Sequence, residues 1–225
     1  MKVILFDLDG TLIDTAPELA DALNRTLRRA GLPAVDEAAV RGWIGDGARA
    51  LLAKALSQAG APPAVALNAW HEFAWDYADC CGSRSTVFEG VRPLLARLRA
   101  QGLRLAVLTN KEANFAHRLL ARHDLADAFE LLVAGDTLSV KKPHPGMVQH
   151  ALAALQAEPH ECLLVGDSLT DLQTARAAGI GIWLVRHGYP QGVFNHPPGG
   201  PDAPDGVIEH FDDFQPLPAQ RVAIV

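Results

Sequence analysis

The hydrophobic and polar positions change their spacing twice along the chain. Residues 3–8, VILFDL, form an almost continuous apolar run rich in β-formers, which predicts a short strand buried on both faces. Between residues 15 and 85 the apolar positions recur at helical spacing, and this part of the sequence has no convincing strand pattern. Thr15 and Glu18 have the spacing of a capping box at the start of the first helix. Helices are expected there over residues 15–30, 37–43, 48–59 and 64–78.

Beyond residue 86, strand patterns alternate with helix patterns. Strands are expected over residues 103–110, 129–135, 161–168, 181–188 and, more briefly, 205–211. Helices are expected between them, over residues 91–102, 111–123, 146–157 and 169–179. Such alternation is typical of a parallel sheet with helices on both faces. The first strand belongs with these later ones. We therefore predict an α/β fold, with a Rossmann-like doubly wound core of residues 1–14 and 86–225 and an inserted all-helical cap of residues 15–85.

Composition narrows the classes of function. The net charge is −6, and no basic cluster exists beyond Lys141 and Lys142, so we expect no nucleic-acid partner. No apolar run is long enough to span a bilayer, and no signal-peptide pattern precedes the first strand. The three cysteines, Cys80, Cys81 and Cys162, make a poor disulfide framework. We expect a cytoplasmic protein without a membrane partner, as a monomer or a homodimer.

Polar residues gather where the predicted strands end. In an open parallel sheet, the carboxyl ends of the strands meet at one edge, and ligands bind there. The residues that follow four successive strands are Asp7 and Asp9, then Thr109 and Asn110, then Lys141 and Lys142, and finally Asp167, Ser168 and Asp171. The sequence therefore predicts one site that combines carboxylates, a lysine and hydrogen-bonding side chains.

Carboxylates that converge from separate strands repel one another unless a cation lies between them. Oxygen ligands suit a hard ion, so we predict Mg²⁺, together with a lysine, between Asp7, Asp9 and Asp167. A carboxylate beside such charges can attack the phosphorus of a phosphoester. Attack by Asp7 would form an acyl phosphate, and Asp9 could donate a proton to the leaving oxygen and then accept one from water. Thr109 and Asn110 could hydrogen-bond the phosphoryl oxygens.

Two of these residues also have a simpler structural interpretation. Asp171 lies three residues after Ser168, so it either caps its helix or supports the metal. Asn110 either binds phosphate or caps the helix that follows it. The positions of the side chains in space decide between these alternatives.

The cap region contains one candidate segment for substrate binding. Gly45, Asp46 and Gly47 precede an expected helix, so their backbone N–H groups could bind a substrate carboxylate, with Arg49 adding charge. The alternative is a helix-breaking turn with no ligand. Near the other end of the chain, residues 190–206 are rich in Pro and Gly, which predicts a surface loop without an assigned role.

Four short motifs, DLDGTL, LTN, KKPHP and GDSLTD, resemble in order and context the four motifs of the haloacid dehalogenase superfamily of phosphohydrolases. The resemblance implies that Asp7 is the nucleophile and Asp9 the acid and base. It implies that Mg²⁺ is held by the Asp7 carboxylate, the backbone carbonyl of Asp9 and the Asp167 carboxylate. Of the two lysines, Lys142 takes the catalytic position, because it precedes the proline of the motif. The helical insertion after the first strand looks like the superfamily's C1 cap.

Within the superfamily, the sequence is most similar to bacterial phosphoglycolate phosphatases. The segments that carry this similarity include RGWIGDGARALLAKAL, SVKKPHP and LVRHGYPQGV. The resemblance implies hydrolysis of a small phosphorylated metabolite, 2-phosphoglycolate, to glycolate and phosphate. The alternatives are a phosphatase of another small metabolite, such as a sugar phosphate or pyrophosphate, and a sugar phosphomutase. A dehalogenase should lack an acid at position 9, so Asp9 argues against that class.

Overall fold

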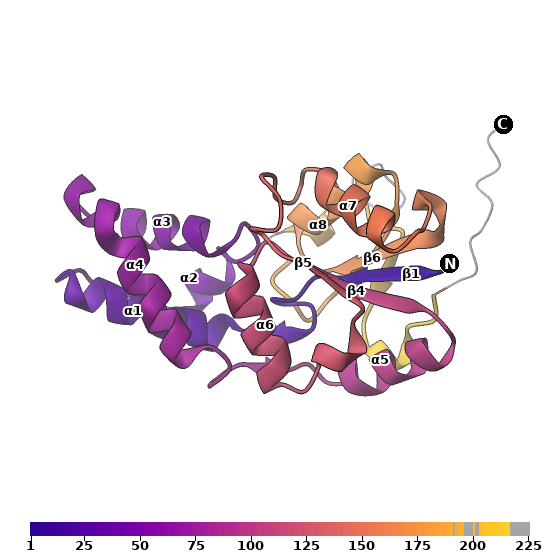
Figure 1. The fold of residues 1–225 in the computed structure, drawn as a ribbon. Helices are drawn as coiled ribbons and strands as arrows, with labels where there is room; N and C mark the ends of the chain where they lie inside the picture. Colours follow the sequence, from indigo (N-terminus) through magenta and orange to yellow (C-terminus); the bar gives the residue numbers. More distant parts are fainter. Residues whose placement is uncertain (191, 196–199, 201–202, 217–225) are drawn as a thin grey trace.

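The computed structural model describes residues 1–190, 192–195, 200 and 203–216. Within these residues, six strands form one parallel sheet with the order β5-β4-β1-β6-β7-β8 (Figure 1). The strands are β1 (Val3–Phe6), β4 (Arg104–Leu108), β5 (Leu131–Val133), β6 (Cys162–Gly166), β7 (Gly181–Val185) and β8 (Gly206–Ile208). Because β1 pairs with both β4 and β6, the first residues of the chain form the centre of the sheet. The predicted α/β fold is confirmed.

Helices cover both faces of this sheet, which explains why its central strand is apolar at every position. The covering helices are α5 (Val91–Ala100), α6 (Ala113–Arg122), α7 (Gly146–Ala154) and α8 (Leu169–Ala178). Ile4 and Phe6 pack in the core with α5 and α6, whereas Val3 and Leu5 pack with α7 and α8 (Figure 1). The two-residue alternation of a strand therefore divides one apolar run between two cores.

Along the sequence, four helices follow β1 and precede α5. They are α1 (Ala16–Arg29), α2 (Glu37–Arg41), α3 (Ala48–Gln58) and α4 (Pro63–Cys80), and we call them the helical insertion. The insertion lies beside the sheet, next to the end at which β1 finishes (Figure 1). Two short antiparallel strands, β2 (Ile13–Asp14) and β3 (Thr86–Val87), pair where the chain enters and leaves it. The expectation that residues 15–85 form a separate cap domain stays a prediction.

The predicted capping box at the start of α1 is wrong. Thr15 makes no side-chain cap, and its hydroxyl instead donates to Asp9 Oδ1 at 2.6 Å. Glu18 is fully buried and accepts hydrogen bonds from the backbone N–H groups of Gly82 at 2.8 Å and Ser85 at 3.1 Å. Both side chains bond outside their own helix, Thr15 to Asp9 in the preceding loop and Glu18 to residues more than 60 positions later in the chain. Glu18 therefore joins the start of the helical insertion to its end.

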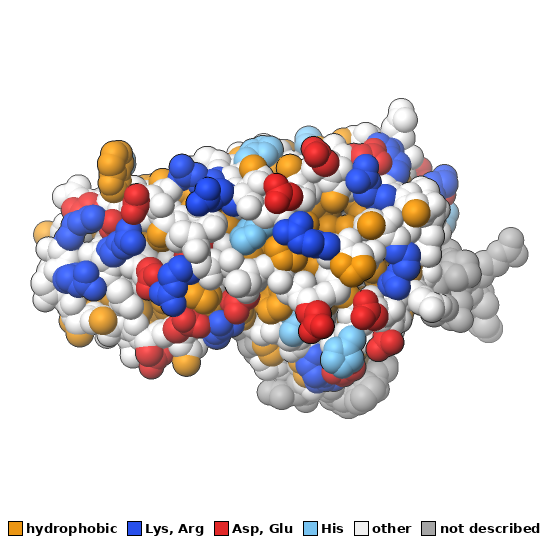
Figure 2. Space-filling model, turned by 90° about the horizontal axis from the view of Figure 1, so that it is seen from below, with side chains coloured by type: hydrophobic (Ala, Val, Ile, Leu, Met, Phe, Trp, Pro, Cys, Tyr) orange, Lys and Arg blue, Asp and Glu red, His pale blue; other side chains and the backbone are white. Residues whose placement is uncertain are grey.

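The remaining expectations concern the surface and the cysteines. Cys80, Cys81 and Cys162 are free thiols, all buried. None of the helices in the described residues has the length and apolar character needed to cross a bilayer. Acidic and basic side chains are interspersed over the face drawn in Figure 2. The predicted surface loop of residues 190–206 lies in part outside the described residues.

Candidate active site

Asp7 directly follows β1, and its backbone N–H still donates to Val165 O of β6 at 2.9 Å. Its side chain is buried, with the Lys142 ammonium 2.8 Å from Oδ1 as an ion pair. Apart from this ammonium, the buried Oδ1 has no polar partner among the described residues. An oxygen of this kind is costly to bury unless a ligand or cation completes its surroundings. Asp7 thus offers a free lone pair inside the protein.

Asp167 directly follows β6 and lies beside Asp7 at the same edge of the sheet. Its Oδ1 accepts from the Thr11 hydroxyl at 2.8 Å, and its Oδ2 accepts from the backbone N–H of Tyr189 at 2.7 Å. Each oxygen keeps a further lone pair, since a carboxylate oxygen accepts about two hydrogen bonds. These neighbours fix the orientation of Asp167 and leave it able to bind a cation.

Asp7, Asp167 and Asp171 form a buried cluster in which one oxygen of each lies within 4.8 Å of the others. Burial raises the pKa of Asp7 to about 7; the Lys142 ammonium opposes this shift and the Asp171 carboxylate adds to it. Burial and the two neighbouring carboxylates likewise raise the pKa of Asp167. One lysine does not balance three carboxylates, and this buried set of carboxylate oxygens fits a hard divalent cation.

Asp171 serves both as a helix cap and as a partner of Lys142. Its Oδ2 accepts from the backbone N–H of Ser168 at 3.1 Å, which completes a capping box, and also from the Ser168 hydroxyl at 2.6 Å and the backbone N–H of Asp167 at 3.2 Å. Its Oδ1 lies 2.7 Å from the Lys142 ammonium. Three donors contact Asp171 Oδ2 and the ammonium contacts its Oδ1, whereas each Asp167 oxygen accepts one hydrogen bond, so Asp7 and Asp167 are better placed to hold a metal. Lys141, by contrast, is half-buried and 3.7 Å from a Glu112 oxygen.

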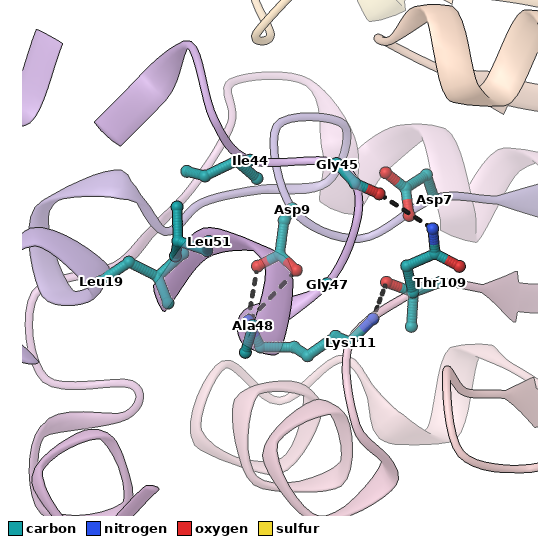
Figure 3. A pocket seen from close by; sticks show the side chains of 11 residues that line it. Asp7, Asp9, Leu19, Ile44, Gly45, Gly47, Ala48, Leu51, Thr109 and Lys111 are labelled. Carbon is teal, nitrogen blue, oxygen red and sulfur yellow. Dashed lines mark hydrogen bonds and ion pairs between the residues drawn. The ribbon is translucent and has the colours of Figure 1, made fainter. Parts of the chain in front are cut away.

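Asp9 lies on the side of Asp7 that faces the helical insertion and is paired with Lys111, a residue absent from the sequence-based site. The Lys111 ammonium is 2.8 Å from Asp9 Oδ1 and 3.1 Å from Oδ2 (Figure 3). The Thr15 hydroxyl donates to the same Oδ1. Asp9 is not part of the buried carboxylate cluster. The available signal for Lys111 was its position immediately after the LTN motif, at the end of β4.

Thr109 and Asn110 both follow β4, but their side chains differ in what they can bind. The Thr109 hydroxyl accepts from the backbone N–H of Lys111 at 3.2 Å and lines the pocket beside Asp7. The Asn110 amide donates to the backbone oxygens of Gly45 and Lys142, both at 3.0 Å, and its Oδ1 accepts from the Lys142 N–H at 2.8 Å. Glu112, not Asn110, precedes α6, so the helix-cap alternative for Asn110 is wrong. Asn110 instead positions Lys142 and holds the helical insertion.

A pocket lies between these residues and the helical insertion (Figure 3). Asp7, Asp9 and Thr109 line it from the sheet, and Gly45 and Gly47 line it from the loop before α3. Gly47 has a φ of +90°, and a Cβ atom there would lie 2.8 Å from the Asn110 carbonyl oxygen, so only glycine fits. The interior volume is about 20 Å³, which is room for roughly one water molecule.

The structure does not bring Arg49 to this pocket. Its guanidinium stacks on the Trp70 ring of α4, 3.8 Å from the ring centroid. It contributes to a separate surface hollow between α3 and α4 together with Leu52 and Trp70. Arg49 is the second residue of α3, and its side chain leaves the helix toward α4 instead of toward the sheet. The prediction that Arg49 adds charge at the substrate site is therefore corrected.

A parallel sheet with a carboxylate pair after β1, a lysine and a further carboxylate cluster defines a class of hydrolytic enzyme. The family described as haloacid dehalogenase-like hydrolase matches residues 1–179 of the chain. The chain belongs to this family. The resemblance based on the four sequence motifs is confirmed.

Individual relatives extend over nearly the whole chain. A phosphoglycolate phosphatase (plasmid) of Cupriavidus necator is 43% identical over 217 residues, which cover 96% of this chain and 91% of the relative. A phosphoglycolate phosphatase of Nitrosococcus oceani is 37% identical over 222 residues, 97% of each chain. The crystal structure of a predicted phosphoglycolate phosphatase from Haemophilus somnus has a TM-score of 0.87 at 31% identity, covering 95% of this chain and 96% of the other. The expected enzyme class, a phosphoric monoester hydrolase, is confirmed.

Proposed function

We propose that the protein is a Mg²⁺-dependent phosphatase that hydrolyses 2-phosphoglycolate to glycolate and phosphate through a phosphoaspartyl intermediate on Asp7. The observation that carries the proposal is the buried Asp7 Oδ1, whose one polar partner among the described residues is the Lys142 ammonium at 2.8 Å. A nucleophile needs such a free lone pair, and a phosphoester needs the positive charge beside it. The names of the relatives at 37–43% identity support this substrate.

The reaction would proceed in two displacements at phosphorus. In the first, an Asp7 oxygen bonds to phosphorus, the ester P–O bond breaks, and Asp9 gives its proton to the leaving glycolate oxygen. In the second, water attacks phosphorus and gives a proton to Asp9, the acyl P–O bond breaks, and Asp7 returns as a carboxylate. Lys142 neutralises phosphoryl charge in both steps. A Mg²⁺ ion bound by Asp7, Asp167 and the Asp9 carbonyl would add positive charge at the same phosphoryl oxygens.

The remaining predicted substrate contacts divide between the sheet and the loop before α3. We propose that the Thr109 hydroxyl binds a phosphoryl oxygen, while Asn110 acts mainly by holding Lys142 in place. The backbone N–H groups at Gly45 and Gly47, at the start of α3, remain proposed contacts for the rest of the substrate. Their support is their position in the pocket lining.

We also propose that residues 15–85 act as a mobile cap over the site. The support is the pocket volume of about 20 Å³, because a phosphoester is several times larger than the water molecule that this space admits. Opening would break the bond from Asn110 to Gly45 O and the 3.3 Å bond from the Thr170 hydroxyl to Asp46. Closure would then exclude water from the reacting groups.

The test is a panel of small phosphoesters scored by kcat/KM, with 2-phosphoglycolate, sugar phosphates and pyrophosphate measured under the same conditions with Mg²⁺. We expect the highest value for 2-phosphoglycolate, by at least about tenfold, which corresponds to about 1.4 kcal/mol of discrimination. A higher value for another ester would overturn the substrate assignment. Isomerisation of a sugar phosphate faster than phosphate release would instead identify a phosphomutase.

A further inference from the structure

One buried cation near the pocket has no role in the chemistry proposed above. Lys111 follows β4, and its side chain is 3% exposed. Its ammonium contacts the Asp9 carboxylate at 2.8 Å and lies 4.8 Å from the centroid of the Tyr77 ring on α4. An ammonium carries three N–H donors, and one carboxylate leaves donor capacity for a second acceptor. Burial by itself lowers the pKa of Lys111, but Asp9 above all more than offsets this effect and keeps the lysine charged.

The side of the pocket opposite the carboxylates is apolar. Lys111 is the one cationic side chain among the described residues that line this pocket. The helical insertion contributes the side chains of Leu19, Ile44, Ala48 and Leu51 (Figure 3). Next to these apolar side chains, the hydroxyl groups of a sugar would lose their hydrogen bonds to water and would form none with the protein. Burying a substrate carboxylate there would also be unfavourable in free energy, unless the carboxylate paired with Lys111.

We propose that Lys111 binds the carboxylate of the substrate and determines the substrate class, namely small phosphate esters of 2-hydroxy acids. The inference rests on the proposed function, because it assumes that Asp9 faces the leaving oxygen. In these esters one carbon atom separates the ester oxygen from the carboxylate. A cation in direct contact with Asp9 therefore stands where the substrate carboxylate has to lie. The substrate contact adds to, or replaces, the contact with Asp9.

The main test compares two esters of matched size, 2-phosphoglycolate and 2-hydroxyethyl phosphate, in which a hydroxymethyl group replaces the carboxylate. For Lys111→Met, we expect kcat/KM for 2-phosphoglycolate to fall about 100-fold, mainly through KM, the size typical of a lost charge-assisted contact. For 2-hydroxyethyl phosphate we expect a smaller loss of kcat/KM, because Asp9 loses its ion-pair partner with either ester, so the preference for 2-phosphoglycolate should fall at least about tenfold. Lys2→Met is the control, because Lys2 is 64% exposed and pairs with Glu161, and neither ester should be affected.

A measurement on the wild-type enzyme keeps the inference testable if Lys111→Met does not fold. Glycolate should inhibit hydrolysis of 2-hydroxyethyl phosphate competitively, and ethylene glycol at the same concentration should not. Equal inhibition by both compounds would overturn the inference. In a folded Lys111→Met variant, an equal loss of kcat/KM with both esters would also overturn it and would leave Lys111 as a residue that positions Asp9.

The failure of this inference can be told apart from the failure of the proposed function. If the wild type prefers 2-phosphoglycolate and Lys111→Met keeps the same preference, the role of Lys111 alone is wrong. If the wild type hydrolyses 2-hydroxyethyl phosphate but not 2-phosphoglycolate, both the role of Lys111 and the proposed substrate are wrong. The phosphatase chemistry on Asp7 would stand in either case.

Discussion

The hydroxyl group of Tyr189 donates a hydrogen bond of 2.5 Å to Asp14 Oδ1, which joins the segment after β7 to the point where the chain enters the helical insertion. The same hydroxyl oxygen accepts from the backbone N–H groups of Thr15 at 3.0 Å and Ala16 at 3.1 Å. The backbone N–H of Tyr189 donates to Asp167. One residue therefore links the carboxylate cluster to the first turn of α1.

Tyr189→Phe should weaken this link while preserving the ring. The variant removes the hydrogen bond to Asp14 and the acceptor of the Thr15 N–H, and it leaves the Ala16 N–H with only its 3.3 Å contact to Asp14 Oδ1. We expect the free energy of unfolding to fall by about 1–3 kcal/mol, measured by urea denaturation. In a double-mutant cycle with Asp14→Asn, the two changes should be non-additive by at least about 0.5 kcal/mol. Additive effects would show that the hydroxyl and the carboxylate act independently.

Asp7→Asn should abolish turnover without unfolding the protein. The amide has nearly the shape of the carboxylate but is a far weaker nucleophile, so kcat should fall by at least about a thousandfold. Steady-state phosphate release measures the loss, and circular dichroism checks the fold. The matched control is Asp79→Asn, whose side chain is 68% exposed and pairs with Arg25; its activity should equal that of the wild type. Residual activity of Asp7→Asn above a thousandth, by the same estimate, would contradict nucleophilic catalysis.

Much of the fold could be predicted from the sequence because its signals are local and strong. The apolar run of β1 reflects a strand that is buried on both faces of the sheet. The helical spacing across residues 15–85 reflects helices that are buried along one stripe. The pairing of β2 with β3 was not predicted, because strands of two residues carry no periodicity. The capping box at Thr15 was wrong for a related reason. Its spacing was correct, but tertiary partners competed for both side chains.

Within the site, the sequence was sufficient to place those residues whose location is set by the course of the backbone. Asp7, Asp167 and Lys142 come together because they follow strands of one parallel sheet. Arg49 was misplaced because the direction of its side chain depends on a ring of another helix. Lys111 was missed because it stands at the boundary between a strand end and a helix pattern. Its proximity to Asp9 depends on a pairing across 102 residues that no local spacing reveals.

Glu18→Gln should destabilise the protein through the junction at the end of the helical insertion. The buried carboxylate accepts from the backbone N–H groups of Gly82 and Ser85 and from the Tyr77 hydroxyl at 3.2 Å. A glutamine would present its own N–H donors to some of these groups, so we expect a loss of about 2–3 kcal/mol in urea denaturation. Glu37→Gln is the control, because its pair with Arg41 is partly exposed, and it should cost less than about 0.5 kcal/mol. Equal stabilities of the two variants would contradict this role for Glu18.

Removal of divalent cations should inactivate the enzyme, and Mg²⁺ should restore it. The carboxylates of Asp7 and Asp167 have too little positive charge around them to bind a phosphoester without a further cation. Phosphate release from 2-phosphoglycolate, measured in EDTA and again after excess Mg²⁺, checks this expectation. Ca²⁺ serves as the control ion, since it is larger and takes more oxygen ligands than the octahedral geometry of Mg²⁺ allows. Full activity in EDTA would remove the metal from the proposed mechanism.

The affinity for Mg²⁺ should also depend on pH, in a direction set by Asp7. Because burial raises the pKa of this group to about 7, protons occupy the ligand below neutrality and the cation has to displace them. The apparent Kd should therefore rise as the pH falls, by about tenfold per unit where the Asp7 proton alone competes and more steeply where a proton on Asp167, whose pKa burial also raises, competes as well. Isothermal titration with Mg²⁺ between pH 5.5 and 8.5 measures this dependence. Asp7→Asn, which cannot take up that proton, should show a shallower slope; an identical slope in both proteins would assign the competing proton to another group.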